Sequence, residues 1–317
     1  MNAASLCALW VLLCSPPRFG EEFHEISSET GPIYWKGLSH EDASWVSREL
    51  PKAMLLARQR LGVVWVRSVD TVILPSRLEM RRFLEREGLG ANSSSFWQPL
   101  GVTVPSRGLV VIRWDHMAPS ESLTETLLHE AAHLVMHPSN SSGLPRWLDE
   151  GLAQWVSGRR LSPDDIAYLV LLARIGALYP FVALEARFPA GHELSSIAYK
   201  ESLLFIQYFV SIRGESGIPE LLDAFHRLPS EQAFKGLFSG GSAQVEKEFH
   251  AWILGQATWG AALASIVNLW SVSGVLALVA VLRHQLRRRR RLEAMETDDP
   301  GQGTSAEPPA SPSNPST

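Results

Sequence analysis

The chain has 317 residues, 45% of them hydrophobic and 20% charged, which is enough to bury one or two ordinary hydrophobic cores. Its net charge of −4 gives no indication of nucleic-acid binding, so we expect no nucleic acid among its partners. Neither the composition nor the net charge predicts an oligomeric state.

The N-terminus carries a short apolar stretch, roughly Leu6 to Leu13, that is too short to cross a bilayer as a stable helix. We therefore predict that residues 1–20 are a secretory signal peptide, although no Lys or Arg precedes the apolar run. A lipid-modified Cys14 or a buried N-terminal strand or helix are the alternatives. Cys7 and Cys14 are the two cysteines. An exported chain without them has no disulfide, and a metal site in it must use His and carboxylate ligands.

Residues 21–256 are predicted to form an exported domain of the α+β class, with a small N-terminal sheet and a mainly helical second half. An amphipathic pattern predicts the first helix, with a break or kink at Pro51. The predicted elements are a helix over 39–62, strands over 63–68 and 70–75, a helix over 76–87, two strands within 97–115 around a turn at 105–108, and helices from Ser120 onward.

The first of these later helices carries the sequence HEAAH, His129 to His133. Ser122 and Glu125 are spaced as a capping box before it, and an apolar pattern indicates a largely buried helix. Two histidines four residues apart lie on one face of a helix and can bind one Zn²⁺. Glu130 then projects beside the metal, where it can take a proton from a water molecule.

The third ligand is not given by this helix alone. His137 is one candidate, but it lies about 12 Å along the axis from His129 and about 80° round it, and Pro138 indicates that the helix ends there. We expect His137 to sit at the helix end instead, favoured by the helix dipole.

A second helix is predicted from Pro145 to Gly158, and it folds back after a short loop. Glu150 on this helix is the favoured third ligand, which leaves an open fourth position typical of a catalytic zinc site. Asp149 is the rival carboxylate. Gly151 would allow close approach of another backbone. Gln154 could support the site, although we favour a surface position for it.

The segments HEAAH and PRWLDEGLAQW together resemble the gluzincin zinc metallopeptidases, which carry HExxH and a downstream WxxEGxA in a peptidase MA-like domain. The direct resemblance covers about 30 residues, counting from the first motif to the second. It implies His129, His133 and Glu150 as zinc ligands, and Glu130 as the general base. It also implies that a strand near 109–114 borders the cleft and pairs with an extended peptide. In such families a later Tyr or His stabilises the oxyanion; Tyr199 is at the matching place, with His192 a weaker alternative.

A long uncharged run near the C-terminus predicts one transmembrane helix over residues 259–282. The run of arginines that follows indicates that residues 283–317, basic and then disordered, are cytoplasmic. A buried helix of a soluble domain, or an arginine run that binds nucleic acid, is the alternative.

The sequence as a whole therefore predicts a zinc metallopeptidase held in the cell membrane by a single span, with its catalytic domain outside the cytoplasm. Its expected partners are a peptide or protein substrate and membrane lipid. A non-catalytic binding or scaffold protein on the same fold, and a zinc hydrolase of non-peptide bonds, are the alternatives.

Overall fold

The structure is a computed structural model that describes residues 19–20, 22–64, 68–89, 100–114, 120–137 and 143–256, with residues 279, 281 and 283. The predicted signal peptide over 1–20 lies almost entirely outside the described residues, as do the predicted span over 259–282 and the tail over 283–317. Among the residues that are described, no helix is both long enough and apolar enough to cross a membrane. The chain divides into two compact units, 1–261 and 262–317, and the fold below belongs to the first.

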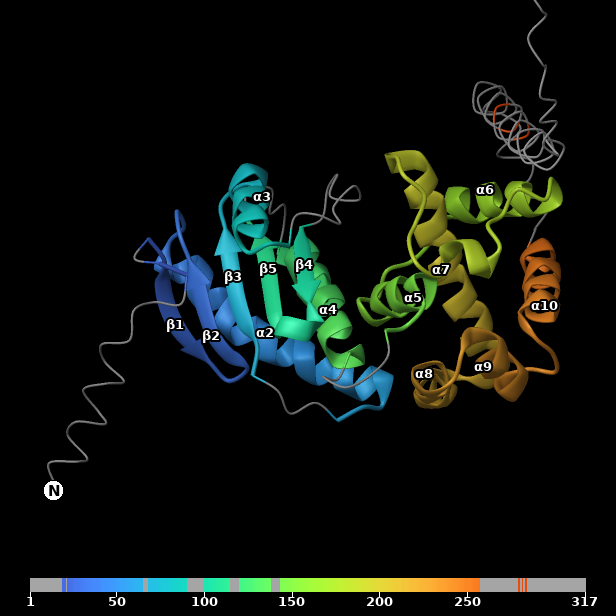
Figure 1. The fold of residues 1–317 in the computed structure, drawn as a ribbon, viewed down its shortest axis with the longest axis horizontal. Coiled ribbons are helices and arrows are strands. Elements are labelled where there is room, and N and C mark those ends of the chain that lie inside the picture. The colour runs from blue at the N-terminus through green and yellow to red at the C-terminus, as the bar shows by residue number, and fades with distance from the viewer. Residues whose placement is uncertain are drawn as a thin grey trace, which may run out of the picture. The chain divides into compact units, whose positions relative to one another are not determined.

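A five-stranded sheet forms the N-terminal half, in the order β1-β2-β3-β5-β4 (Figure 1). The three central strands are parallel, while each outer strand is antiparallel to its neighbour. The α+β prediction is confirmed, as are the strands predicted near β3, β4 and β5. The strand predicted over 63–68 is wrong at its described residues, 63, 64 and 68, which are not in a strand. The hairpin of β1 and β2 was not predicted. The strands are β1 His24–Ser28, β2 Gly31–Trp35, β3 Asp70–Leu74, β4 Gly101–Val104 and β5 Leu109–Arg113, with a 3-10 turn η2 at Pro105–Arg107 before β5.

Helices cover both faces of this sheet because successive strand residues point to opposite sides. Ile73 and Ile112 pack with α2 (His40–Leu61) and α4 (Ser120–Met136) on one face. Val72 and Val111 pack with α3 (Arg77–Arg86) on the other. The sheet thus gives α4, which carries the HEAAH motif, a rigid support.

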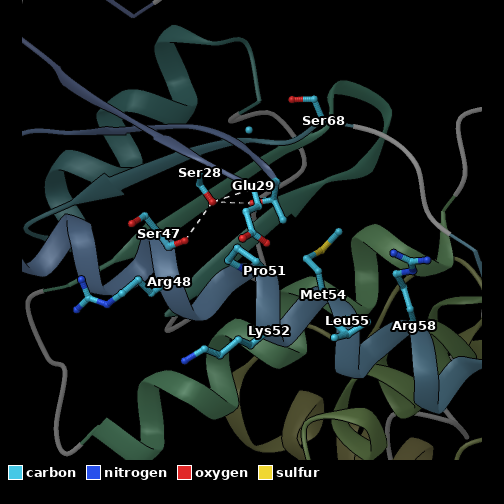
Figure 2. Close-up of a pocket in the computed structure, with 12 residues that line it drawn as sticks. Ser28, Glu29, Ser47, Arg48, Pro51, Lys52, Met54, Leu55, Arg58 and Ser68 are labelled. Carbon is cyan, nitrogen blue, oxygen red and sulfur yellow. Dashed lines mark hydrogen bonds between the residues drawn. The ribbon is translucent and has the colours of Figure 1, made fainter.

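The prediction of a break at Pro51 is wrong, because α2 runs as one helix from its Ser39 cap to Gly62. A proline cannot donate to the carbonyl four residues earlier, which here belongs to Ser47. The Ser28 hydroxyl at the end of β1 donates to that carbonyl at 3.1 Å instead. Figure 2 shows this bond at the edge of a pocket of about 910 Å³ between the β1–β2 turn and α2.

The second half of the unit is helical, as predicted. Helix α4 begins at Ser120, so the predicted capping role of Ser122 is wrong: Ser122 lies within the helix. The elements after α4 are α5 Arg146–Val156, α6 Pro163–Arg174, the 3-10 turn η3 Phe181–Leu184, α7 His192–Arg213, the 3-10 turn η4 Glu215–Gly217, α8 Ile218–Arg227, α9 Ser230–Leu237 and α10 Ser242–Gly255.

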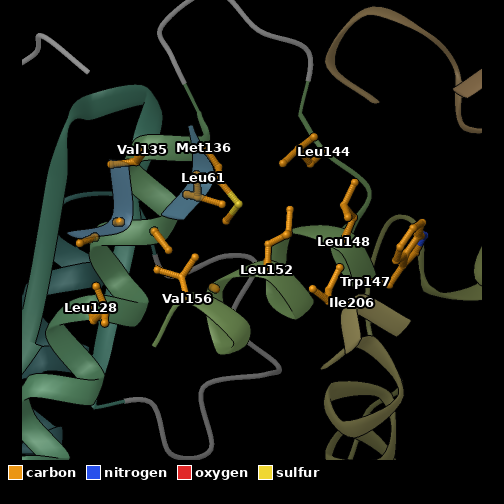
Figure 3. Close-up of a cluster of buried hydrophobic side chains, with 14 of the residues drawn as sticks. Leu61, Leu128, Val135, Met136, Leu144, Trp147, Leu148, Leu152, Val156 and Ile206 are labelled. Atoms are coloured by element: carbon orange, nitrogen blue, oxygen red, sulfur yellow. The ribbon is translucent and has the colours of Figure 1, made fainter. Parts of the chain in front are cut away.

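Helix α5 lies between α4 and α7 and shares a hydrophobic core with both (Figure 3). On the α7 side, Trp147 stacks on Phe181 with ring centroids 4.8 Å apart and meets Phe205 edge-on at 5.0 Å. Gly151 allows the closest approach, since a Cβ there would lie 2.6 Å from the Ser202 carbonyl oxygen of α7. This packing fixes the position of α5 against both neighbouring helices.

Candidate metal centre

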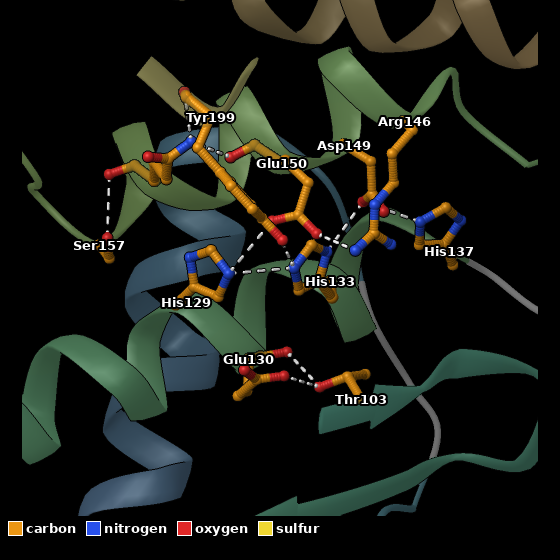
Figure 4. A network of polar contacts seen from close by, with 11 residues as sticks. Thr103, His129, Glu130, His133, His137, Arg146, Asp149, Glu150, Ser157 and Tyr199 are labelled. Atoms are coloured by element: carbon orange, nitrogen blue, oxygen red, sulfur yellow. Dashed lines mark hydrogen bonds and ion pairs between the residues drawn. The ribbon is translucent and has the colours of Figure 1, made fainter. Parts of the chain in front are cut away.

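Three side chains that could bind a metal converge between α4 and α5 (Figure 4). The Nε2 atoms of His129 and His133 lie 3.2 Å apart. Oε2 of Glu150 lies 3.5 Å from the first nitrogen and 3.7 Å from the second. The structure thus brings the three predicted ligands together, with a carboxylate of the second helix facing the histidine pair.

These three atoms fit a zinc ion. Tetrahedral ligands with bonds of about 2.0–2.2 Å are separated by about 3.3–3.6 Å, close to the distances found here. Oε2 of Glu150 is buried and has no hydrogen-bond partner among the described residues. A buried, unpartnered carboxylate oxygen is costly unless a cation binds it. The donor set of two imidazoles and one carboxylate therefore matches a three-ligand zinc site with an open fourth position.

Asp149 lies behind His133 and does not face the three converging atoms. Its Oδ1 accepts a hydrogen bond of 2.9 Å from Nδ1 of His133 and another of 2.9 Å from Nε2 of His137. Burial opposes the charged form of His133, but the carboxylates of Asp149 and Glu150 outweigh it and raise the pKa of His133 to about 9. With Nδ1–H held by Asp149, Nε2 of His133 is the nitrogen left for a metal.

His137 is thus a partner of Asp149 and not a ligand of the first group. Helix α4 ends at Met136, near the predicted end, but the His137 side chain contacts α5 rather than the last carbonyls of its own helix. His133, His137 and Asp149 form a second group whose nitrogen and oxygen atoms lie near one another. The two groups share His133. Its Nδ1 contacts Asp149, whereas its Nε2 faces His129 and Glu150.

Arg146 binds the second carboxylate oxygen of Glu150. Its guanidinium lies 2.5 Å from Oε1 of Glu150, one helical turn further along α5. Burial raises the pKa of Glu150, but His133, His129 and Arg146 outweigh it, and the pKa lies below its usual value. The carboxylate is therefore ionised and held at Oε1, with Oε2 turned to the two histidines.

The carboxylate of Glu130 lies against β4. The hydroxyl of Thr103 lies 2.6 Å from Oε2 of Glu130 and 3.2 Å from its main-chain carbonyl oxygen. Glu130 is 6% exposed, and its charge acts on both His133 and Tyr199. The predicted base is therefore next to the metal centre and tied to the sheet.

Tyr199 reaches the same centre from α7. Burial first, and then the charge of Glu150, raise the pKa of Tyr199 to about 12, so the phenol is protonated at neutral pH and able to donate. Its side chain also interacts with Arg146. The alternative, His192, is exposed at the first residue of α7, about two helical turns before Tyr199.

Two expectations need correction. Gln154 is buried rather than on the surface, and its amide donates to the carbonyl oxygens of Glu150 and Tyr199 at 3.1 and 2.9 Å. The strand over 109–114 cannot take an added peptide strand, because β5 is paired on both sides, with β3 and with β4. Among the described strands, β4 is the edge beside α4.

The sequence did not single out Arg146, Thr103 or Gly101. Arg146 precedes Glu150 by four residues, a spacing that places the two side chains on one helix face and could have predicted their ion pair. No comparable signal exists for Thr103, because its contact with Glu130 depends on how α4 lies against the sheet.

The chain is similar to known proteins over part of its length. Several solved structures are similar to it, and the chain spans about half the length of the two described next. One is an M1 zinc metallopeptidase from Deinococcus radiodurans, with 15% identity, a TM-score of 0.41, and coverage of 75% of this chain and 52% of that one. The other is a two-domain M1 zinc metallopeptidase variant bound to L-arginine, with 12% identity, a TM-score of 0.36, and coverage of 73% and 50%. No curated protein matches the chain. The residues from 100 to 255, from β4 to α10, match the family model of the Peptidase MA superfamily.

Proposed function

We propose that the chain is a zinc-dependent peptidase that hydrolyses peptide bonds of peptides or proteins. The observation that carries this proposal is the triangle of His129, His133 and Glu150, in which Oε2 of Glu150 is buried and has no hydrogen-bond partner among the described residues. The Peptidase MA superfamily match over residues 100–255 supports the same reaction class.

In this proposal each residue has one task. His129, His133 and Glu150 would hold the zinc ion, which when bound polarises the scissile carbonyl and acidifies a water molecule. Glu130 accepts the proton of the attacking water and delivers it to the leaving amine. The protonated hydroxyl of Tyr199 stabilises the negative charge on the carbonyl oxygen. Arg146 and Asp149 hold the ligands in place.

The first test combines zinc analysis with cleavage of a peptide library by the purified full-length chain. We expect about one zinc per chain, and a Glu130→Gln variant that keeps zinc but loses at least about 100-fold in kcat, as expected for removal of a general base. Glu125→Gln on an exposed part of the same helix is the matched control and should cleave normally.

Absence of zinc, or normal cleavage by Glu130→Gln, would refute the mechanism. Zinc without cleavage of any library peptide would favour a non-catalytic binding protein. Cleavage of a non-peptide bond that depends on Glu130 would assign a different substrate to the same chemistry.

We also propose that this domain lies outside the cytoplasm, with the chain anchored through residues 259–282. The support is the sequence alone: the apolar run and the arginines after it. A reporter that is active only outside the cytoplasm should be active when fused after residue 256 and inactive when fused at the C-terminus. The reverse pattern, or a chain released by carbonate washing, would rule out this topology.

A further inference from the structure

The strand β4 presents two residues to the carboxylate of Glu130. Gly101 and Thr103 are two positions apart, so they face the same side of the strand. That side is the one against α4, since both residues contact Glu130. Val102, between them, packs in the cluster on the other face of the sheet.

Thr103 makes the polar contact. Its hydroxyl has one proton, which it can give either to Oε2 of Glu130 at 2.6 Å or to the carbonyl oxygen at 3.2 Å. The shorter bond to the charged oxygen is the stronger one. The hydroxyl can also accept, so a bond to Oε2 remains possible while the carboxyl carries the transferred proton.

Gly101 provides the space. A Cβ at this position would lie 2.5 Å from Cγ, 2.7 Å from Cδ and 2.7 Å from Oε1 of Glu130. Any larger residue would push the carboxyl out of its place. The Thr103 hydroxyl at Oε2 and the Gly101 backbone beside Oε1 together define the position of the Glu130 carboxylate. Figure 4 shows the contact with Thr103.

We propose that Thr103 is a positioning residue for the reaction: its hydroxyl holds the carboxylate of Glu130 in the orientation in which it exchanges protons with the substrate water and the leaving amine. The inference rests on the proposed peptidase function and on Glu130 as its base. A free glutamate side chain samples many rotamers, and holding one reduces the entropy that must be lost on reaching the transition state. Without the Thr103 hydroxyl, Glu130 would still be present as the base, but its carboxylate would be misplaced.

The test measures three variants of the full-length chain, Thr103→Val, Thr103→Ser and Val102→Ala, on one peptide identified by the library assay. Valine has nearly the shape of threonine and suits a strand, so the substitution removes the hydroxyl alone. We expect Thr103→Val to lower kcat about 10- to 100-fold with KM changed less than about threefold and zinc content unchanged. Thr103→Ser should stay within about threefold of wild type. Val102→Ala, on the other face of β4, controls for general loosening of the strand and should leave kcat unchanged.

A double variant separates positioning from structural support. Because Thr103 acts through Glu130, adding Thr103→Val to Glu130→Gln should cause no further loss of kcat. The inference is overturned if Thr103→Val retains kcat within twofold, if Thr103→Ser loses as much as Thr103→Val, or if the two losses multiply. If Thr103→Val does not fold, Thr103→Ala takes its place. Full activity of Glu130→Gln would instead overturn the proposed function, so the two failures are distinct.

Discussion

Individual atoms decide what each histidine and carboxylate of the centre can do. Spacing in the sequence was enough to pair His129 with His133 and to place Glu130 beside them, because all three belong to one helix. It was not enough to separate Glu150 from Asp149, which are neighbours about 100° apart on α5. The separation comes from how α5 packs: Glu150 Oε2 faces both Nε2 atoms, whereas Asp149 meets Nδ1 of His133.

Asp149→Asn should lower zinc affinity about 10- to 100-fold, the usual effect of losing a carboxylate behind a histidine ligand. The amide keeps an acceptor for His133 but not the charge that favours Nδ1–H. His137→Gln is the control, because it removes the other partner of Asp149 and leaves its bond to His133. Competition with a chromogenic chelator measures the affinities, and an Asp149→Asn variant that binds zinc as tightly as wild type would contradict the assignment.

Helices and strands differ in how far their sequences predicted them. Helix α3 and the strands β3, β4 and β5 follow from local patterns and turn residues. The β1–β2 hairpin lacks a clear alternation, and its strand β2 also pairs with β3, far along the chain. Within α2, the Ser47 carbonyl that Pro51 leaves without a helical donor likewise accepts from a hydroxyl of another element, Ser28. Local patterns carry no information on such partners.

Gly151→Ala tests the contact of α5 with α7. Alanine favours a helix over glycine by about 1 kcal/mol, but its Cβ would meet the Ser202 carbonyl of α7 at 2.6 Å. Such overpacking destabilises by about 1–3 kcal/mol and should also displace the neighbouring ligand Glu150. We expect a lower urea midpoint and weaker zinc binding.

Gly236→Ala in α9, where a Cβ meets nothing within 4 Å, is the control and should be neutral or stabilising. Equal behaviour of the two variants would contradict this packing argument.

The stability of the whole unit is coupled to a buried carboxyl, Glu201, that is not part of the candidate metal centre. Glu201 of α7 is 5% exposed, and its oxygens accept hydrogen bonds of 3.1 and 3.3 Å from the main-chain N–H of Tyr179, between α6 and η3. Burial raises the pKa of Glu201 well above its usual value, and the Tyr179 hydrogen bond offsets only part of this. The sequence did not indicate it, because Glu201 lies on a helix whose burial on this face comes from packing with other elements.

The sign of the pH effect follows from where the proton is bound more tightly. The folded pKa of Glu201 is above the unfolded one, so its favourable contribution is complete below the unfolded pKa and is lost as pH rises through the folded pKa. Each tenfold difference in proton affinity between the two states corresponds to about 1.4 kcal/mol.

Glu201→Gln stays neutral and keeps an acceptor for Tyr179, so it should have a higher urea midpoint than wild type at pH 8 and a smaller difference at pH 5. Glu193→Gln, exposed on the same helix, should match wild type at both pH values. The measurement is made with a chelator present, so that zinc binding does not contribute to the pH dependence. If Glu201→Gln is no more stable than wild type at pH 8, the pKa of Glu201 is not raised in the folded state and the argument is wrong.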